Sequence, residues 1–243
     1  MLVVAPGAGE VIGDAPDRRV EILSDHPSLH VTWSRFGPRR DGADLHVHHR
    51  HTDLFYVLAG EMTVRLGPDG DEVAVAAGTL ARVPPLVAHG FRNGTDLELR
   101  YLNLHVPGAG FADYMRGLRD RRPVAFDQDD PPADGGRPAR EAVVGAAEAA
   151  GDGVVRHAED EVIAVFELHG GTAAPAPGPR EVRSLYVLEG ELAVVAGRRE
   201  VLAPAGTWVQ APAGVPVTVA APAGARHLDV RTPAAQPSGT RGA

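Results

Sequence analysis

Three histidines and one aspartate are spaced so that they could bind a metal ion. His46 and His48 lie two residues apart in the segment LHVHHRHTDLFYVLAG, and residues two apart on a strand face the same side. Asp53 follows after a short turn, and His89 comes from the later segment GTLARVPPLVAHGFRN. Three imidazoles and one carboxylate suit Fe, Mn, Co, Ni, Cu or Zn as divalent ions. We therefore expect His46, His48, Asp53 and His89 to bind one divalent metal ion of unassigned identity.

A simpler interpretation is a histidine-rich surface tract that binds metals without a native role. It accounts for residues 46–51 but not for Asp53 and His89, which lie outside the tract. On this basis His49 and His51 are expected to be exposed, or to support the ligands rather than bind the metal.

The composition excludes several kinds of chemistry. The chain has a net charge of −8, which disfavours nucleic acid as a partner. It contains no cysteine, and all 24 basic residues are arginine, so thiolate and Schiff-base catalysis are excluded. No run of 18 apolar residues and no signal-peptide pattern is present, so we expect no membrane partner and a cytoplasmic location.

Short Val/Leu/Tyr-rich runs separated by glycine and proline predict many short strands. The runs are Arg19–Leu23, Leu29–Phe36, Leu54–Leu58, Glu61–Leu66, Glu72–Val75, Leu80–Val83 and Leu97–Val106. The pattern then changes: Phe111–Arg119 has helical spacing, a Pro/Gly/Asp-rich stretch follows, and the Ala-rich Glu141–Ala150 predicts a second short helix. Strand patterns resume near Val154.

An internal repeat connects the two strand-rich halves. LFYVLAGEMTV at residues 54–64 matches SLYVLEGELAV at 184–194, and AGTLARVPPLVAHG at 77–90 matches AGTWVQAPAGVPVT at 205–218. Two copies of one β module joined by a linker are the simplest explanation.

The motifs around the candidate ligands resemble those of the cupin superfamily, which read G-x5-H-x-H-x3–4-E-x6-G and G-x5-P-x-G-x2-H-x3-N. The first appears here from His46 to Gly60 and the second from Gly78 to Asn93. Three positions differ: Arg40 replaces the leading glycine, Leu86 replaces a turn glycine, and Asp53 replaces glutamate.

The resemblance implies an all-β fold of two cupin-type jelly-roll β-barrels joined by a short helical linker. We expect a metal-binding barrel at residues 1–108, a helical and Pro/Gly-rich linker at 109–153, a degenerate barrel at 154–232 and a disordered tail at 233–243.

The second copy lacks every candidate ligand. By the spacing of the repeat, Ala176, Gly178, Arg183 and Val217 stand at the four ligand positions. Arg183 would disfavour a cation, and we expect it to pair with Glu181 or Glu167. Binding of a substrate carboxylate by Arg183 is the alternative.

Further candidates flank the metal ligands. Tyr101, Asn103 and His105 share one face of their strand, so they could line the pocket or serve as hydrogen-bonded core residues. Of these, Tyr101 and His105 are candidate catalytic groups together with Asp53. Arg65 could hold an acidic substrate or form an ion pair at the rim.

Within the superfamily the pattern is most similar to quercetin-dioxygenase-type and related small cupins. This resemblance implies a metal-dependent dioxygenase acting on a small phenolic, enol or β-dicarbonyl substrate, with the carboxylate accepting the substrate proton. A metal-dependent isomerase or decarboxylase, and a non-catalytic small-molecule or metal-binding protein, are the alternatives. The assembly state stays open, with a homodimer among the options.

Overall fold

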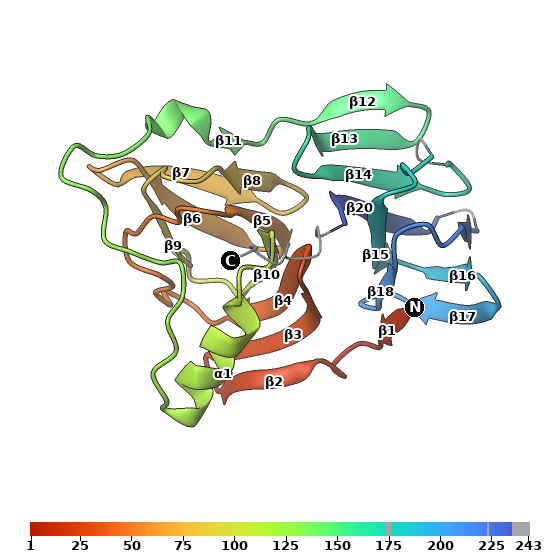
Figure 1. The fold of residues 1–243 in the computed structure, drawn as a ribbon, viewed down its shortest axis with the longest axis horizontal. Helices are drawn as coiled ribbons and strands as arrows, with labels where there is room; N and C mark the ends of the chain where they lie inside the picture. The colour runs from red at the N-terminus through yellow and green to blue at the C-terminus, as the bar shows by residue number, and fades with distance from the viewer. Residues whose placement is uncertain (174–175, 223, 235–243) are drawn as a thin grey trace, which may run out of the picture.

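The computed structural model describes residues 1–173, 176–222 and 224–234. In this part of the chain the regular structure is almost entirely β strand, and it forms two β-sandwich regions with one short α-helix in the segment of sequence that connects them (Figure 1). The all-β prediction is therefore confirmed. Of the predicted tail, Pro233 ends the last strand, whereas residues 235–243 lie outside the described residues.

The N-terminal barrel consists of two antiparallel sheets. Its seven-stranded sheet has the order β11 (Val143–Val144), β8 (Leu80–Val83), β5 (Thr52–Ala59), β10 (Leu99–Val106), β4 (Leu29–Phe36), β3 (Arg18–His26) and β2 (Glu10–Ala15). Its three-stranded sheet has the order β7 (Asp71–Ala76), β6 (Glu61–Leu66) and β9 (His89–Arg92).

The C-terminal barrel repeats this arrangement. Its seven-stranded sheet has the order β1 (Leu2–Val4), β18 (Trp208–Ala211), β15 (Glu181–Glu189), β20 (Arg226–Pro233), β14 (Ala164–His169), β13 (Val154–Glu159) and β12 (Glu148–Gly151). Its three-stranded sheet has the order β17 (Arg199–Pro204), β16 (Glu191–Ala196) and β19 (Val217–Ala220). The sequence repeat thus corresponds to a structural repeat, with β5, β8 and β10 equivalent to β15, β18 and β20.

In each barrel, one edge strand of the larger sheet comes from a distant part of the sequence. The first strand, β1, pairs with β18 of the C-terminal barrel, and β11 from the connecting segment pairs with β8 of the N-terminal barrel (Figure 1). Within the range 1–108 expected for the metal-binding barrel, strand β1 thus contributes to the sheet of the C-terminal barrel.

Strand alternation divides the interior into separate cores. On β5, Phe55 and Val57 face the interior of the N-terminal barrel, whereas Leu54 and Tyr56 pack against residues of the C-terminal barrel. Both faces of β5 are therefore buried, which explains why its sequence is a continuous apolar run rather than an alternating one.

The turns of the repeat are conserved in geometry but not always in residue type. Gly60 and its equivalent Gly190 have φ of 77° and 74°, which favours glycine. In the turn that follows the equivalent residues Pro84 and Pro212, Gly214 has φ of 75° and its equivalent Leu86 has φ of 67°. Leu86 therefore adopts a left-handed conformation that is unfavourable for a residue with a side chain.

The connecting segment contains one helix and not the two that the sequence predicts. Helix α1 (Phe111–Asp120) confirms the first, and a 3-10 turn follows at Ala139–Glu141. Residues 141–150, predicted as helical, instead form β11 and β12, because the edges of β8 and β13 offer backbone partners that outweigh the helix propensity of alanine.

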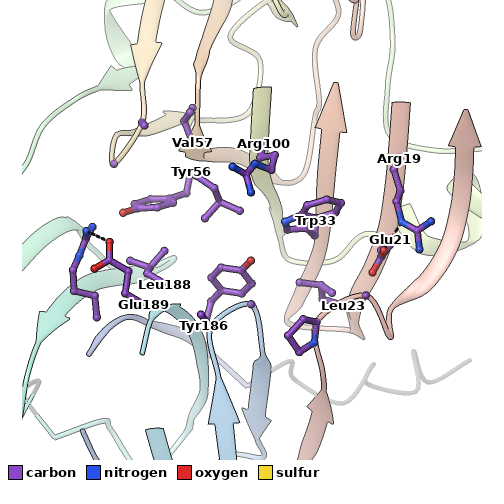
Figure 2. Close-up of a pocket in the computed structure, with 18 residues that line it drawn as sticks. Arg19, Glu21, Leu23, Trp33, Tyr56, Val57, Arg100, Tyr186, Leu188 and Glu189 are labelled. Carbon is purple, nitrogen blue, oxygen red and sulfur yellow. Dashed lines mark hydrogen bonds and ion pairs between the residues drawn. The ribbon is translucent and has the colours of Figure 1, made fainter. Parts of the chain in front are cut away.

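A large cavity of about 770 Å³ lies between the two barrels. Figure 2 shows that Tyr56 and Arg100 reach it from the N-terminal barrel, and Tyr186 and Glu189 reach it from the C-terminal barrel. None of the candidate metal ligands lines this cavity, so it is not the candidate site.

Candidate metal centre

The structure brings His46, His48, Asp53 and His89 together inside the N-terminal barrel. One donor atom from each lies within 4.8 Å of the others, and all four residues are buried. A reciprocal pair of backbone hydrogen bonds, each 2.9 Å, joins His46 to His89. Asp53 stands near the start of β5, where the chain enters the sheet after the turn at residues 49–51.

The distances between the donor atoms are short. Nε2 of His46 lies 3.2 Å from Nε2 of His48, and Nε2 of His89 lies 3.3 Å from Oδ2 of Asp53. Nε2 of His48 lies 3.7 Å from the same carboxylate oxygen. Three ring nitrogens and one carboxylate oxygen therefore converge on one point.

The other ring nitrogens fix the tautomer of each histidine. Nδ1 of His46 donates to the Asp44 carbonyl at 2.7 Å, Nδ1 of His89 donates to the Val87 carbonyl at 2.9 Å, and Nδ1 of His48 donates to the Asp127 carbonyl. In the neutral rings, Nε2 then carries a lone pair and no proton. Facing lone pairs repel one another, so this arrangement fits a cation at the point of convergence.

Burial favours the neutral form of His46. Burial, together with the nearby His89, lowers the pKa of His46 to about 3. Its imidazole is therefore uncharged and able to bind a metal at neutral pH.

The Asp53 carboxylate is held ionised and oriented. Burial by itself would raise the pKa of Asp53, but His105, His48 and His89 outweigh it and hold the pKa well below its usual value. The Asn103 amide donates to Oδ1 of Asp53 at 2.5 Å, which leaves Oδ2 directed at the histidines. Although aspartate is one methylene shorter than the glutamate of the family motif, the Asp53 carboxylate thus reaches the histidines.

Asp127 supports the site and was not predicted from the sequence. Its carboxylate accepts hydrogen bonds from the backbone N–H groups of His49 and Arg50 at 3.0 and 2.8 Å, and from Nδ1 of His51 at 3.0 Å. Burial alone would raise the pKa of Asp127, but these N–H groups lower it. The segment expected to be only a linker therefore holds the turn between His48 and Asp53.

The residues expected to be peripheral have distinct environments. His49 is 51% exposed and pairs with Asp129 at 3.2 Å, whereas His51 is buried and supports the site through Asp127. Asn93 fixes a turn, because its amide donates to the carbonyls of Gly37 and Leu97 at 2.7 Å each.

A cavity of about 250 Å³ adjoins the candidate ligands, and its wall includes Tyr101, Asn103 and His105. Burial raises the pKa of Tyr101 and lowers the pKa of His105, so both are neutral near pH 7. Nε2 of His105 lies 3.0 Å from Oδ1 of Asn103 and 3.7 Å from Oδ1 of Asp53. The structure thus places both candidate catalytic groups on the cavity wall.

Aromatic side chains from the connecting segment cover one side of the centre. Phe111 of α1 stacks on His105 with 3.9 Å between the ring centroids. Phe126 stacks on Tyr114 of α1 at 5.0 Å and contacts the ring of His48 at 5.7 Å. Arg65, by contrast, lies at the rim, where it donates to the Ala43 carbonyl at 3.1 Å.

The equivalent point of the C-terminal barrel is occupied by protein charges. Arg183 donates to Asp229 at 2.6 and 2.9 Å, and Nε of Arg231 donates to the other oxygen of Asp229 at 2.9 Å. The predicted partners of Arg183, Glu181 and Glu167, were wrong, because the side chains of β15 and β20 that face the interior meet across neighbouring strands. Within the described residues, two overlapping clusters have donor atoms close enough to hold a metal, and both lie in the N-terminal barrel. They are His46, His48, Asp53 and His89, and His48, His51 and His105.

Comparisons with known proteins agree with this architecture. The cupin domain family model matches residues 32–105. Quercetin 2,3-dioxygenase of Bacillus subtilis (strain 168) is 30% identical over 120 residues, which cover 49% of this chain and 34% of that protein, so the match spans about a third of the relative. The N-terminal barrel therefore contains a cupin domain, at residues 32–105, and the chain as a whole has a bicupin-like fold.

Solved structures extend the similarity of fold to the whole chain. Protein Ylba from E. coli has a TM-score of 0.69 at 13% identity, covering 97% of this chain and 92% of that one. Oxalate decarboxylase of Lactobacillus farciminis has a TM-score of 0.63 at 12% identity, covering 97% and 87%. At these identities the likeness concerns the fold alone.

No helix among the described residues has the length and apolar character required to cross a membrane.

Proposed function

We propose that the N-terminal barrel binds one divalent metal ion through His46, His48, Asp53 and His89 and acts as a metal-dependent dioxygenase on a small phenolic, enol or β-dicarbonyl compound. The observation that carries the proposal is the convergence of three Nε2 atoms, on rings that donate through Nδ1, and one carboxylate at a buried point beside a cavity. A bound metal would supply Lewis acidity and, with Fe, Mn, Co, Ni or Cu, access to redox chemistry.

The side chains around the cavity have separate roles in this proposal. Asn103 orients Asp53, whose ionised carboxylate accepts the proton that a phenol or enol loses on binding. Tyr101, held protonated by burial, is a hydrogen-bond donor to a substrate oxygen. Phe91 and Phe111 keep water away from the reacting atoms.

The size of the cavity limits the substrate. Pockets for drug-sized ligands span about 300–1,000 Å³, and this one has about 250 Å³. A substrate with one ring, or an open-chain enol of similar size, fits this volume. We therefore favour a substrate smaller than the quercetin for which the Bacillus relative is named.

The second candidate is an isomerase or decarboxylase that uses the same ligands without oxygen. The observation that supports this candidate is the buried position of Asp53 on the cavity wall, from which it could transfer a substrate proton without any redox step. A metal-binding protein with no turnover is the third.

Oxygen uptake separates these functions. The protein, purified without a histidine tag, is loaded in turn with each divalent metal, and oxygen consumption is measured with catechols, hydroxybenzoates and β-diketones. The dioxygenase proposal expects uptake that is lost in His48→Ala, together with the metal, and retained in His49→Ala. Product formation without oxygen uptake would support the second candidate, and binding without turnover would support the third.

A further inference from the structure

Among the residues that the structure describes, one cation on the wall of the metal cavity has no hydrogen bond and no ion pair. Arg18 lies on β3 in register with Val20 and Ile22, which face the interior of the N-terminal barrel. Its side chain lines the same cavity as His46, His48 and Asp53. Arg18 therefore belongs to the pocket rather than to the outer surface of the sheet.

The neighbouring arginines are neutralised, and Arg18 is not. Arg19 donates to Glu21 at 2.6 Å and to Asp14 at 2.9 Å, and Arg40, also on the cavity wall, donates to Asp17 at 2.7 Å. Within the described part of the chain, the Arg18 side chain has no hydrogen bond and no ion pair.

The surroundings of Arg18 increase the need for a partner. Its Nε atom is buried without a hydrogen-bond acceptor, and its guanidinium lies 5.9 Å from the centre of the Phe36 ring. Asp41 also lines the cavity but is exposed and forms no ion pair with Arg18 in the described structure. A buried N–H group without an acceptor is unfavourable, and a guanidinium matches the two oxygens of a carboxylate.

The remaining wall suits a flat ligand. The rings of Phe36 and Phe91 are stacked with 6.0 Å between centroids, and Tyr101 meets them edge-on at 5.4 and 5.6 Å. Such a wall accommodates a planar ring between the metal ligands and Arg18.

We propose that Arg18 binds a carboxylate of the substrate, at a position distinct from the oxygens that bind the metal, so that the substrate is a small planar acid. This inference rests on the proposed function for the metal-bound end of the substrate. Arg18 is then a specificity residue, which selects acids over neutral compounds of the same shape.

Binding of two probes of equal shape tests this inference. The protein is loaded with Zn²⁺, which prevents redox turnover, and its affinities for 3,4-dihydroxybenzoate and 3,4-dihydroxybenzamide are measured by calorimetry. Both probes offer the same two oxygens to the metal, and only the first carries a carboxylate. We expect the acid to bind about tenfold or more tightly than the amide, as charge-assisted hydrogen bonds predict.

Two variants locate the source of this preference. Arg18→Gln should bind both probes equally, with the affinity for the amide unchanged, and thermal unfolding checks that it is folded. Arg35→Gln is the matched control, because Arg35 is a half-buried arginine on the adjacent strand that donates to the carbonyls of Ala15 and Pro16 outside the cavity. It should keep the preference.

Three outcomes would overturn the inference: equal affinities in the wild type, a preference that survives Arg18→Gln, or no binding of either probe. The oxygen-uptake assay is independent of this result. A protein without oxygenase activity that still prefers the acid through Arg18 would refute the proposed function and retain the carboxylate site.

Discussion

Asp53 and Arg183 occupy the same position in the two barrels. Asp53 on β5 pairs with Val83, the residue before Pro84, and Arg183 on β15 pairs with Ala211, the residue before Pro212. Across the other neighbouring strand, Asp53 faces His105 and Arg183 faces Arg231. The charge at the centre of the fold is thus reversed between the two copies.

This reversal predicts one metal ion per chain. The cluster of Arg183, Arg231 and Asp229 carries a net positive charge, which repels a cation, whereas the N-terminal cluster carries a net negative charge. Elemental analysis after dialysis should give a metal-to-protein ratio near one. A ratio near two tightly bound ions would show that the C-terminal barrel also has a site.

Substitution of Asp53 separates its charge from its shape. Asp53→Ala and Asp53→Asn should each weaken metal binding by about tenfold or more, because both remove a charged ligand. Asp53→Glu keeps the charge but must displace the carboxylate by about 1.5 Å, one C–C bond. Metal titrations of the three variants measure these effects. Wild-type affinity in all three would leave a site of histidines only.

Loss of the Asp127 carboxylate should weaken metal binding, although Asp127 is not one of the proposed ligands. Asp127→Ala leaves the N–H groups of His49 and Arg50 and the ring of His51 without their acceptor, so the turn before Asp53 loosens. Groups that orient metal ligands typically change affinity by about 10–100-fold. Asp129→Asn is the control, since within the described residues the Asp129 side chain pairs with the exposed His49 alone, and its backbone bonds to Val47 stay in place. Equal metal affinity in the two variants would contradict the role of Asp127.

The protein should be more stable with glycine at position 86 than with alanine there. Its φ of 67° is unfavourable for any residue with a Cβ by about 1–2 kcal/mol, and glycine removes that penalty. Leu86→Gly should therefore exceed Leu86→Ala by about 1 kcal/mol in the free energy of unfolding, measured in urea. At the exposed Leu97, which is not among the positive-φ residues, the order should be reversed. The same order at both positions would refute the strain at Leu86.

The contact between the barrels should stabilise the protein less at acid pH, because Glu167 then becomes protonated. Its carboxylate accepts hydrogen bonds from Tyr56 of the other barrel at 2.9 Å and from Arg226 at 2.8–3.0 Å. Burial would raise the pKa of Glu167, but His157, Tyr56 and Arg226 lower it from 4.5 to about 2.

A pKa that is lower in the folded state stabilises the protein above the unfolded value, and this contribution is lost as the pH falls from 4.5 towards 2. Glu167→Gln should therefore lower the free energy of unfolding by about 3 kcal/mol at pH 7, and the difference should shrink below pH 4.5. Glu189→Gln, which also loses a bond to Arg226 but is 58% exposed, should have a small effect. A difference that does not change with pH would contradict this linkage.

The sequence predicted the parts of the site that short segments encode. His46, His48 and Asp53 lie within eight residues, so strand alternation and one turn suffice to bring them together. The repeat likewise located the second barrel and its missing ligands. Local patterns were informative wherever the residues concerned lie close together in the chain.

Contacts between distant segments were not predictable in this way. Asp127 lies 76–79 residues from the turn that it holds, in a stretch without periodicity, and no signal marks it there. The partner of Arg183 was missed because it depends on which strand lies beside β15. The helix expected at 141–150 failed for a related reason, since two sheet edges offered it backbone partners.

The pairing of β1 with β18 has a consequence for synthesis of the protein on the ribosome. Leu2–Val4 are translated about two hundred residues before their partners Trp208–Gln210. At about 5–20 residues per second, this delay is on the order of 10–40 s. During that interval the apolar strand has no partner within its own chain, and an unpaired strand edge can associate with other nascent chains. Strand β1 therefore acquires its sheet partner only after the whole N-terminal barrel and most of the C-terminal barrel have been synthesised.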